Sequence, residues 1–444
     1  MREGSLEAPT RHPLDWQSAD FLDAEKLDAE MRRVFDICHG CRRCFNLCDS
    51  FPRLFDLVDA QSNEMEGVKS EDFKQVVDAC TLCDMCFMTK CPYVPPHSFN
   101  VDFPHLMLRY RALEHAQGKT GFVARQLGRT DRNGTALAPV APVVNWANDT
   151  GNALTRPILE GVAGIDRNAA LPKFHGQTFA RRARAEAVAV NREAPGFGRK
   201  VALYATCFVN YNNPGIGMAA RAVLAKNGVE TEVAYPSCCG MPLLEQGDLA
   251  AVAARAEKVA AEMAPWIDKG YDVVALVPSC ALMLKFEWPL IVPKSEAVKR
   301  LAQATFDIGE YVVDIAKKQG LAPGLKPLDG GVTVHLACHA RAQNVGAKAA
   351  ELLRLIPETE VGVIERCSGH GGSWGIMKDN FEVAMKVGRP VAKQALDRGK
   401  AYVASECPLA GAHIVQGMQR LDAGKAPGTA PHPIELMAKA YGLI

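Results

Sequence analysis

The chain carries CHGCRRCFNLC at residues 38–48 and CTLCDMCFMTKC at residues 80–91. Each run places three thiols at CxxCxxC spacing and adds a fourth thiol with three or four residues in between. Three thiols at this spacing let the backbone wrap one corner of an iron–sulfur cubane. A structural zinc site typically uses CxxC pairs and has no use for the third thiol. The runs therefore predict iron–sulfur clusters, and the alternative is a zinc-stabilised binding module without redox activity.

The two runs resemble those of bacterial-type [4Fe–4S] ferredoxins, in which the fourth cysteine of each run binds the other run's cluster. The resemblance predicts one cluster on Cys38, Cys41, Cys44 and Cys91, and a second on Cys80, Cys83, Cys86 and Cys48. Asp49 stands where ferredoxins usually have proline, and Cys91 lies one residue further out than usual. Neither departure removes a ligand.

Helical patterns lead into both runs. Residues 20–37 and the segment from Ser70 to Cys80 each carry an apolar stripe at helical spacing. Since small soluble ferredoxins use short strands there, we expect residues 1–104 to form an α-helical ferredoxin domain with two clusters. Arg42, Arg43 and Lys90 are placed to offset the negative charge of the clusters, although ordinary solvated surface charges would look the same.

The composition bounds the class of protein. A length of 444 residues suggests two to four domains, and 51 Lys and Arg balance 50 Asp and Glu, so nothing indicates a nucleic-acid binder. We find neither an apolar leader segment nor a run of about 18 apolar residues, so a cytoplasmic location is expected. Peripheral attachment to the cytoplasmic face of the inner membrane stays open. Fifteen cysteines in a reducing compartment indicate metal ligands rather than disulfides.

Residues 105–197 are predicted to be a connecting region, in which helical patterns alternate with segments rich in proline and glycine. The run from Phe179 to Arg192 is typical of an exposed basic helix. We identify no residues of this region that carry chemistry.

From residue 198 onward the pattern becomes that of an α/β protein in which a cysteine follows each buried strand. Strands at 201–204, 229–234 and 273–277 precede Cys207, Cys238, Cys239 and Cys280. The order then repeats, with strands at 332–335, 360–364 and 401–404 before Cys338, Cys367 and Cys407. Parallel strands place ligands at their carboxyl ends. We therefore predict two duplicated lobes with parallel sheets, residues 198–325 and 326–444, each with one cysteine site.

A double cysteine run followed by two Cys–CCG–Cys units resembles the CCG-domain family. This family includes iron–sulfur subunits of anaerobic glycerol-3-phosphate dehydrogenase, heterodisulfide reductase and glycolate oxidase. The resemblance implies a non-catalytic redox subunit that relays electrons from a flavoprotein dehydrogenase towards the quinone pool. The alternative within the family is a thiol/disulfide reductase acting at the cluster of the CCG lobe.

Missing thiols distinguish the two lobes. A full CCG unit has five cysteines, but Met283 stands at the last position of the first unit, which leaves four thiols, enough for one conventional cluster. The second unit has Ser368 and Ala410 at two thiol positions and keeps three. A fourth ligand there would have to come from elsewhere, and the candidates are His339, His370 and His413. A weak, site-differentiated or absent second-lobe cluster is the expectation.

Overall fold

The computed structural model describes residues 7–444, apart from the side chain of Lys90. The chain divides into two compact units. The first comprises residues up to 128 together with 240–253 and 290–293, and the second comprises residues 129–239, 254–289 and 294–444. The predicted four-part division of the chain stays a prediction.

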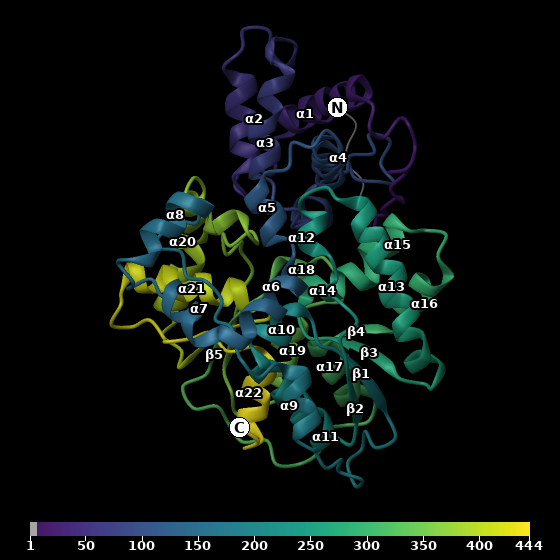
Figure 1. Cartoon of the computed structure of the whole chain (residues 1–444), viewed down its shortest axis with the longest axis vertical. Coiled ribbons are helices and arrows are strands. Elements are labelled where there is room, and N and C mark those ends of the chain that lie inside the picture. The colour runs from purple at the N-terminus through teal and green to yellow at the C-terminus, as the bar shows by residue number, and fades with distance from the viewer. Residues whose placement is uncertain (1–6) are drawn as a thin grey trace. The chain divides into compact units, whose positions relative to one another are not determined.

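The first unit is helical (Figure 1). Asp23 caps α1, accepting a hydrogen bond from the Lys26 N–H (2.8 Å), and the helix buries Leu27, Met31, Val34 and Phe35. Helix α1 ends at Cys41, inside the first cysteine run, and α3 ends at Ala79, directly before the second run. Helices thus lead into both runs, as the sequence predicts. The helices of this unit include α1 (Ala24–Cys41), α2 (Ser50–Asp59), α3 (Phe73–Ala79), the π-helix η3 (Cys86–Lys90), α4 (Phe103–Ala116), α5 (Phe122–Leu127) and α12 (Met241–Leu244).

The second unit contains two parallel sheets. The first lobe has the strand order β2-β1-β3-β4, with β1 Lys200–Tyr204, β2 Glu230–Ala234, β3 Asp272–Ala275 and β4 Thr305–Asp307. The second lobe has the order β6-β5-β7, with β5 Val332–His335, β6 Val361–Ile364 and β7 Tyr402–Ser405. The predicted duplication with parallel sheets is confirmed. The short edge strand β4 was not predicted, because three residues carry too little pattern to be recognised.

Helices connect and cover these strands. The longest are α13 (Leu249–Asp268), α20 (Phe381–Arg398), α21 (Pro408–Leu421) and α11 (Pro214–Lys226). The others include α6 (Thr130–Leu137), α7 (Ala141–Asn148), α8 (Thr155–Ala163), α9 (Phe179–Ala185), α10 (Cys207–Tyr211), α14 (Pro278–Leu282), η5 (Met283–Glu287), α15 (Trp288–Ile291), α16 (Glu296–Ala304), α17 (Ile308–Lys318), α18 (Cys338–Arg341), α19 (Lys348–Arg354) and α22 (Pro433–Ala440). The predicted basic helix is shorter than expected, since α9 ends at Ala185.

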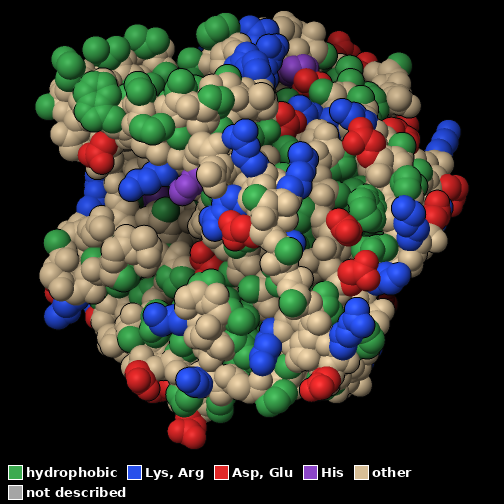
Figure 2. All heavy atoms as spheres, turned by 60° about the horizontal axis from the view of Figure 1, so that its bottom comes forward, with side chains coloured by type: hydrophobic (Ala, Val, Ile, Leu, Met, Phe, Trp, Pro, Cys, Tyr) green, Lys and Arg blue, Asp and Glu red, His purple; other side chains and the backbone are tan. Residues whose placement is uncertain are grey.

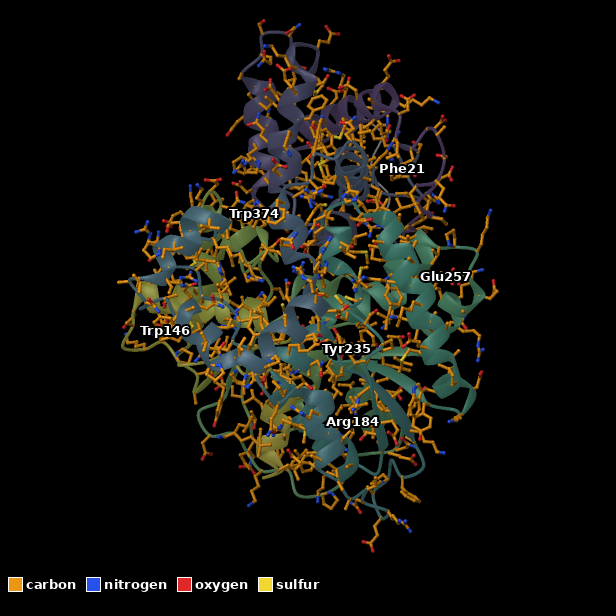
Figure 3. The ribbon with its side chains drawn as sticks, in the orientation of Figure 1. Phe21, Trp146, Arg184, Tyr235, Glu257 and Trp374 are labelled. Atoms are coloured by element: carbon orange, nitrogen blue, oxygen red, sulfur yellow. The ribbon has the colours of Figure 1, made fainter. Side chains whose placement is uncertain are left out.

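An apolar face lies on α7 and α8. Six large apolar side chains between residues 140 and 162 are exposed: Val140, Val143, Trp146, Leu154, Ile158 and Val162. Trp146 lies at the edge of the second unit in Figure 3, and Figure 2 shows hydrophobic side chains gathered at its upper left with few charges among them. Contiguous exposure of this kind is characteristic of contact with another molecule. Among the described residues, every helix is too short or too polar to cross a bilayer.

Gly388 of α20 provides a test of the packing in the second lobe. A methyl group at this position would lie 2.2 Å from the Ser368 carbonyl oxygen. Overpacking of this kind costs about 1–3 kcal/mol, so we expect Gly388→Ala to lower the thermal midpoint of unfolding. Gly161→Ala in α8 is the control, because its methyl group meets no described atom within 4 Å and alanine favours helix. An unchanged midpoint for Gly388→Ala would contradict the close packing.

Candidate functional site

Four thiols from both cysteine runs line one pocket in the first unit. Cys91 of the second run lines this pocket together with Cys38, Cys41 and Cys44 of the first. Arg43, Tyr93 and several apolar side chains complete its wall. Burial raises the pKa of Cys38 well above its ordinary value, and the charges of Cys91, Cys44 and Cys41 raise it further.

A second group of thiols surrounds Cys86. Burial raises the pKa of Cys86 well above its ordinary value, and the charges of Cys83, Cys80 and Cys48 raise it further, followed by that of Cys44. Cys48 of the first run therefore lies with the thiols of the second. Cys91 thus lies with the first three thiols of the other run, and the charges on Cys86 come from thiols of both runs, whereas the exchanged ligand sets of the ferredoxin pattern stay a prediction.

The π-helix η3 explains how the longer second run reaches its pocket. The Cys91 N–H bonds the Cys86 carbonyl at 2.8 Å, a five-residue spacing that accommodates one residue more than an α-helical turn. The π-helix η5 follows Cys280 in the same way, at Met283–Glu287. Met283, which replaces the fifth thiol of the first CCG unit, is fully buried there.

The structure describes two of the three predicted cations, Arg42 and Arg43, and adds a further one. Arg43 lines the first pocket, whereas Arg42 pairs with Asp59, and the side chain of Lys90 lies outside the described part of the chain. The Arg111 guanidinium donates to the backbone carbonyls of Val77 and Cys80 at the start of the second run. No sequence pattern pointed to Arg111, because it is an isolated polar residue of α4, 31 residues beyond Cys80.

The first CCG lobe brings its four thiols together at the carboxyl end of the sheet. Contact with the Cys238 thiol, burial, and the charges of Cys238 and Cys280 raise the pKa of Cys207 well above its ordinary value. The Cys239 thiol makes hydrogen bonds with the thiols of Cys238 and Cys280, and these contacts raise its pKa well above the ordinary value. Four thiols confined to one buried place cannot all ionise without a compensating cation, and the iron of a cluster would supply that charge. The donor set therefore fits an iron–sulfur cluster.

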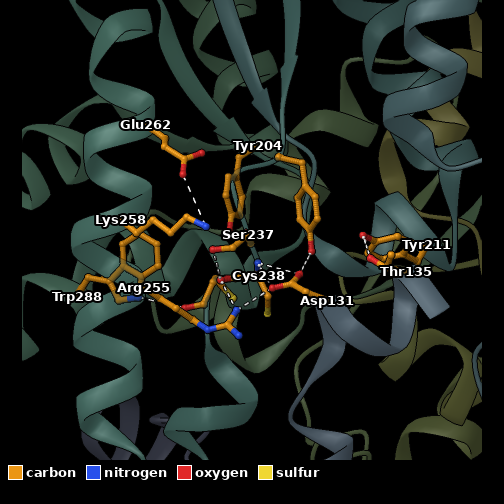
Figure 4. Close-up of polar contacts among 12 residues, drawn as sticks. Asp131, Thr135, Tyr204, Tyr211, Ser237, Cys238, Arg255, Lys258, Glu262 and Trp288 are labelled. Carbon is orange, nitrogen blue, oxygen red and sulfur yellow. Dashed lines mark hydrogen bonds and ion pairs between the residues drawn. The ribbon is translucent and has the colours of Figure 1, made fainter. Parts of the chain in front are cut away.

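Residues of α6 support this site, contrary to the expectation that residues 105–197 carry no chemistry. The Asp131 carboxylate accepts the Cys238 N–H (3.0 Å) and the Tyr235 hydroxyl, and it pairs with Arg255 (2.9 Å), as Figure 4 shows. Tyr235, labelled in Figure 3, is half-buried. The neighbouring Thr130 side chain lowers the pKa of the Cys207 thiol. A polar pair at the start of a helix is typical of an ordinary surface turn, so sequence patterns could not have found these contacts.

The last residue of the central strand has the same role in both lobes. The Tyr204 hydroxyl donates to the Ser237 carbonyl (2.5 Å), immediately before the CCG cysteines. His335 occupies the equivalent place, with Nε2 2.9 Å from the Arg366 carbonyl before Cys367 and Nδ1 3.0 Å from the Ser405 hydroxyl. Burial lowers the pKa of His335 to about 4, so the ring is neutral. Both side chains brace the loop that carries the CCG motif.

The second lobe arranges its thiols differently. Cys338, Cys367 and Cys407 follow three neighbouring strands whose ends are in register, His335 opposite Ile364 and Ser405. Burial raises the pKa of Cys367, and the Gly369 N–H lies 3.4 Å from its sulfur. The charge of Cys280 in the first lobe acts on Cys407. Among residues 7–444 as described, no three Cys, His, Asp or Glu side chains form a ready site for a single metal ion.

The three histidine candidates of the second lobe have different partners. His339 Nδ1 lies 2.8 Å from the Ser279 hydroxyl of the first lobe. The rings of His370 and His413 lie 5.9 Å apart, and the Nε2 atom of each is buried without a hydrogen-bond partner among the described residues. Of the three candidates, His370 and His413 are therefore the two whose Nε2 atom could bind a metal without losing a hydrogen bond.

Comparison with known proteins identifies the family to which this architecture belongs. The family model of the cysteine-rich domain CCG matches residues 201–285 and 332–414. Lactate utilization protein A of Geobacillus kaustophilus is 30% identical over 219 residues, 46% of this chain and 82% of that protein. The chain belongs to the CCG family.

Two further relatives cover more of this CCG protein. One subunit of the anaerobic glycerol-3-phosphate dehydrogenase of Escherichia coli is 29% identical over 320 residues, 71% of this chain and 76% of that protein. One subunit of the fumarate reductase (CoM/CoB) of Methanothermobacter marburgensis is 23% identical over 404 residues, 86% of this chain and 76% of that protein. The family resemblance predicted from the cysteine pattern is confirmed.

Asp131→Ala tests whether α6 supports the first CCG site. The change leaves the buried Cys238 N–H without its acceptor, at a cost of about 1–3 kcal/mol, and removes the partner of Arg255. We expect a lower thermal midpoint and a loss of iron from the first lobe, measured as iron per chain after anaerobic purification. Asp329→Ala, at an exposed carboxylate, is the control. Wild-type iron content and stability in Asp131→Ala would refute the supporting role.

Proposed function

We propose that this CCG-family protein is an iron–sulfur electron-transfer subunit that relays electrons from a flavoprotein dehydrogenase towards a quinone. Its relatives include a subunit of anaerobic glycerol-3-phosphate dehydrogenase and a subunit of a fumarate reductase. These relatives are subunits of redox enzymes, and this chain carries two cysteine-rich domains. Together they support an electron-transfer role. The identity of the dehydrogenase and the quinone acceptor are the finer parts of the proposal.

The observation that carries the proposal is the sharing of thiols between distant segments. Cys91 lies in one pocket with Cys38, Cys41 and Cys44, although about fifty residues separate them. When bound, [4Fe–4S] clusters accept and release single electrons. The chain's part is to bury the thiolates and to supply hydrogen bonds and cations: the Tyr93 and Val94 N–H groups bond the Cys91 sulfur, and Arg43 lines its pocket.

The ligand assignment follows the three crowded groups of thiols. We assign one [4Fe–4S] cluster to Cys38, Cys41, Cys44 and Cys91, one to Cys80, Cys83, Cys86 and Cys48, and one cluster to Cys207, Cys238, Cys239 and Cys280. The absence of a thiol at Met283 favours a conventional cluster in the first lobe over the larger cysteine set of a disulfide reductase.

Assembly with a partner is supported by the apolar face of α7 and α8. Its exposed side chains, such as Trp146 and Ile158, would be covered in a complex. In the proposed complex a flavoprotein donates electrons, and a peripheral position at the membrane gives access to quinone.

Metal analysis tests the proposed function directly. After anaerobic purification of the full chain we expect at least about twelve irons with matching sulfide, because three four-iron clusters are assigned. A reductive titration followed by EPR should resolve several one-electron steps. Zinc in place of iron would end the proposal, and turnover of a disulfide without any partner would favour the disulfide reductase instead.

Serine variants test the exchanged ligands. We expect Cys91→Ser to alter the same EPR signal as Cys38→Ser, and Cys48→Ser to alter the same signal as Cys86→Ser. The reason is that each fourth thiol lies among the thiols of the other run. If Cys91→Ser altered the same EPR signal as Cys86→Ser, and Cys48→Ser the same signal as Cys38→Ser, each run would bind its own cluster.

A further inference from the structure

The second lobe has a histidine close to each of the two positions at which it lacks a CCG thiol. In the second lobe Ser368 and Ala410 stand where a full CCG unit has thiols. Two residues after Ser368 comes His370, whose equivalent in the first lobe is Met241; three residues after Ala410 comes His413, whose equivalent is Phe286. The second lobe therefore has an imidazole close to each of its two gaps, whereas the first lobe, which has a single gap at Met283, has apolar residues at both equivalent positions.

The fold brings these two histidines to one place. The loop after Cys367 packs on α20, where a methyl group added to Gly388 would lie 2.2 Å from the Ser368 carbonyl oxygen and 3.4 Å from His413 Cδ2. His413 comes from α21, which begins immediately after Cys407, and it is 6% exposed. Its ring lies 5.9 Å from that of His370, so both meet beside the CCG loop.

Both rings present an unused nitrogen. Neither Nε2 atom has a hydrogen-bond partner among the described residues, although both atoms are buried. His413 bonds the Ala384 backbone, and since its Nε2 has no partner, this bond is made through Nδ1. A backbone carbonyl on Nδ1 fixes the tautomer that leaves the Nε2 lone pair available, as in many metal-ligating histidines. Burial lowers the pKa of His370 to about 3 and that of His413 below its ordinary value, so both imidazoles are neutral.

We propose that the second lobe binds an iron–sulfur cluster through mixed ligation, in which His370 and His413 take the place of the two missing thiols beside Cys338, Cys367 and Cys407. This inference rests on the proposed function insofar as it assumes that the chain assembles iron–sulfur clusters. Neutral imidazoles lower the negative charge of a cluster relative to thiolates, and histidine ligation raises the reduction potential. The second-lobe cluster would then have a higher reduction potential than the same cluster held by thiolates alone.

Nitrogen spectroscopy on the full-length protein tests the proposal. We expect the chain, purified anaerobically and poised in a redox titration, to show a strongly coupled ¹⁴N signal by HYSCORE that changes to ¹⁵N when histidine is labelled. His370→Met and His413→Phe reproduce the first lobe. Each should weaken or remove this coupling, and the double variant should lose about two to four irons per chain while the signals of the other clusters persist.

His432→Asn is the matched control. His432 is buried in the same lobe, but its Nδ1 already accepts the Ile434 N–H (3.1 Å) and the ring bonds the Glu406 backbone. Asparagine retains a capping acceptor, so the nitrogen coupling should be unchanged. Introducing Ser368→Cys into His370→Met should restore iron without restoring that nitrogen's coupling, which separates ligand loss from misfolding.

The outcomes are distinguishable. A chain that binds no iron at any site overturns the proposed function itself. A chain that holds its other clusters but shows no strongly coupled histidine nitrogen, or keeps that coupling in the His370→Met, His413→Phe double variant, overturns only the mixed ligation.

Discussion

Thiolates repel one another, and this chain buries many of its thiols close together. The cost appears in the raised pKa of Cys38, Cys86 and Cys239, each of which lies among other thiols and away from water. Confining such groups requires a scaffold that holds each segment in place. Helix ends do this in the first unit, and strands in register do it in both lobes, where Tyr204 lies opposite Ala234 and Ala275. The surrounding hydrogen bonds serve the same end, because they hold the loops that carry the thiols.

The two lobes show that one scaffold can support unequal sites. Both end the central strand with a polar side chain, Tyr204 or His335, that bonds the carbonyl before the CCG loop. Beyond this shared brace they diverge. The first loop is anchored from outside the lobe by Asp131 on α6, whereas the second packs directly on α20 at Gly388. Duplication thus preserved the frame while the groups that surround each set of thiols changed.

Much of the fold was predictable because cysteines follow the ends of its strands. A thiol after each buried strand marks the carboxyl end of a parallel sheet, and six of the seven strands were found in this way. Contacts made by isolated polar residues were not predictable, since Asp131 and Arg111 belong to no repeating pattern and act through backbone groups far away in sequence. The pairing of His370 with His413 likewise depends on how α20 and α21 pack, which spacing alone does not determine.

The path of the chain through its two units has a practical consequence. The first unit takes in residues 240–253 and 290–293 as well as residues up to 128. A fragment that ends at residue 128 would therefore lack two segments of this unit. For the same reason, a fragment that begins at residue 129 would carry segments that pack with residues it no longer contains.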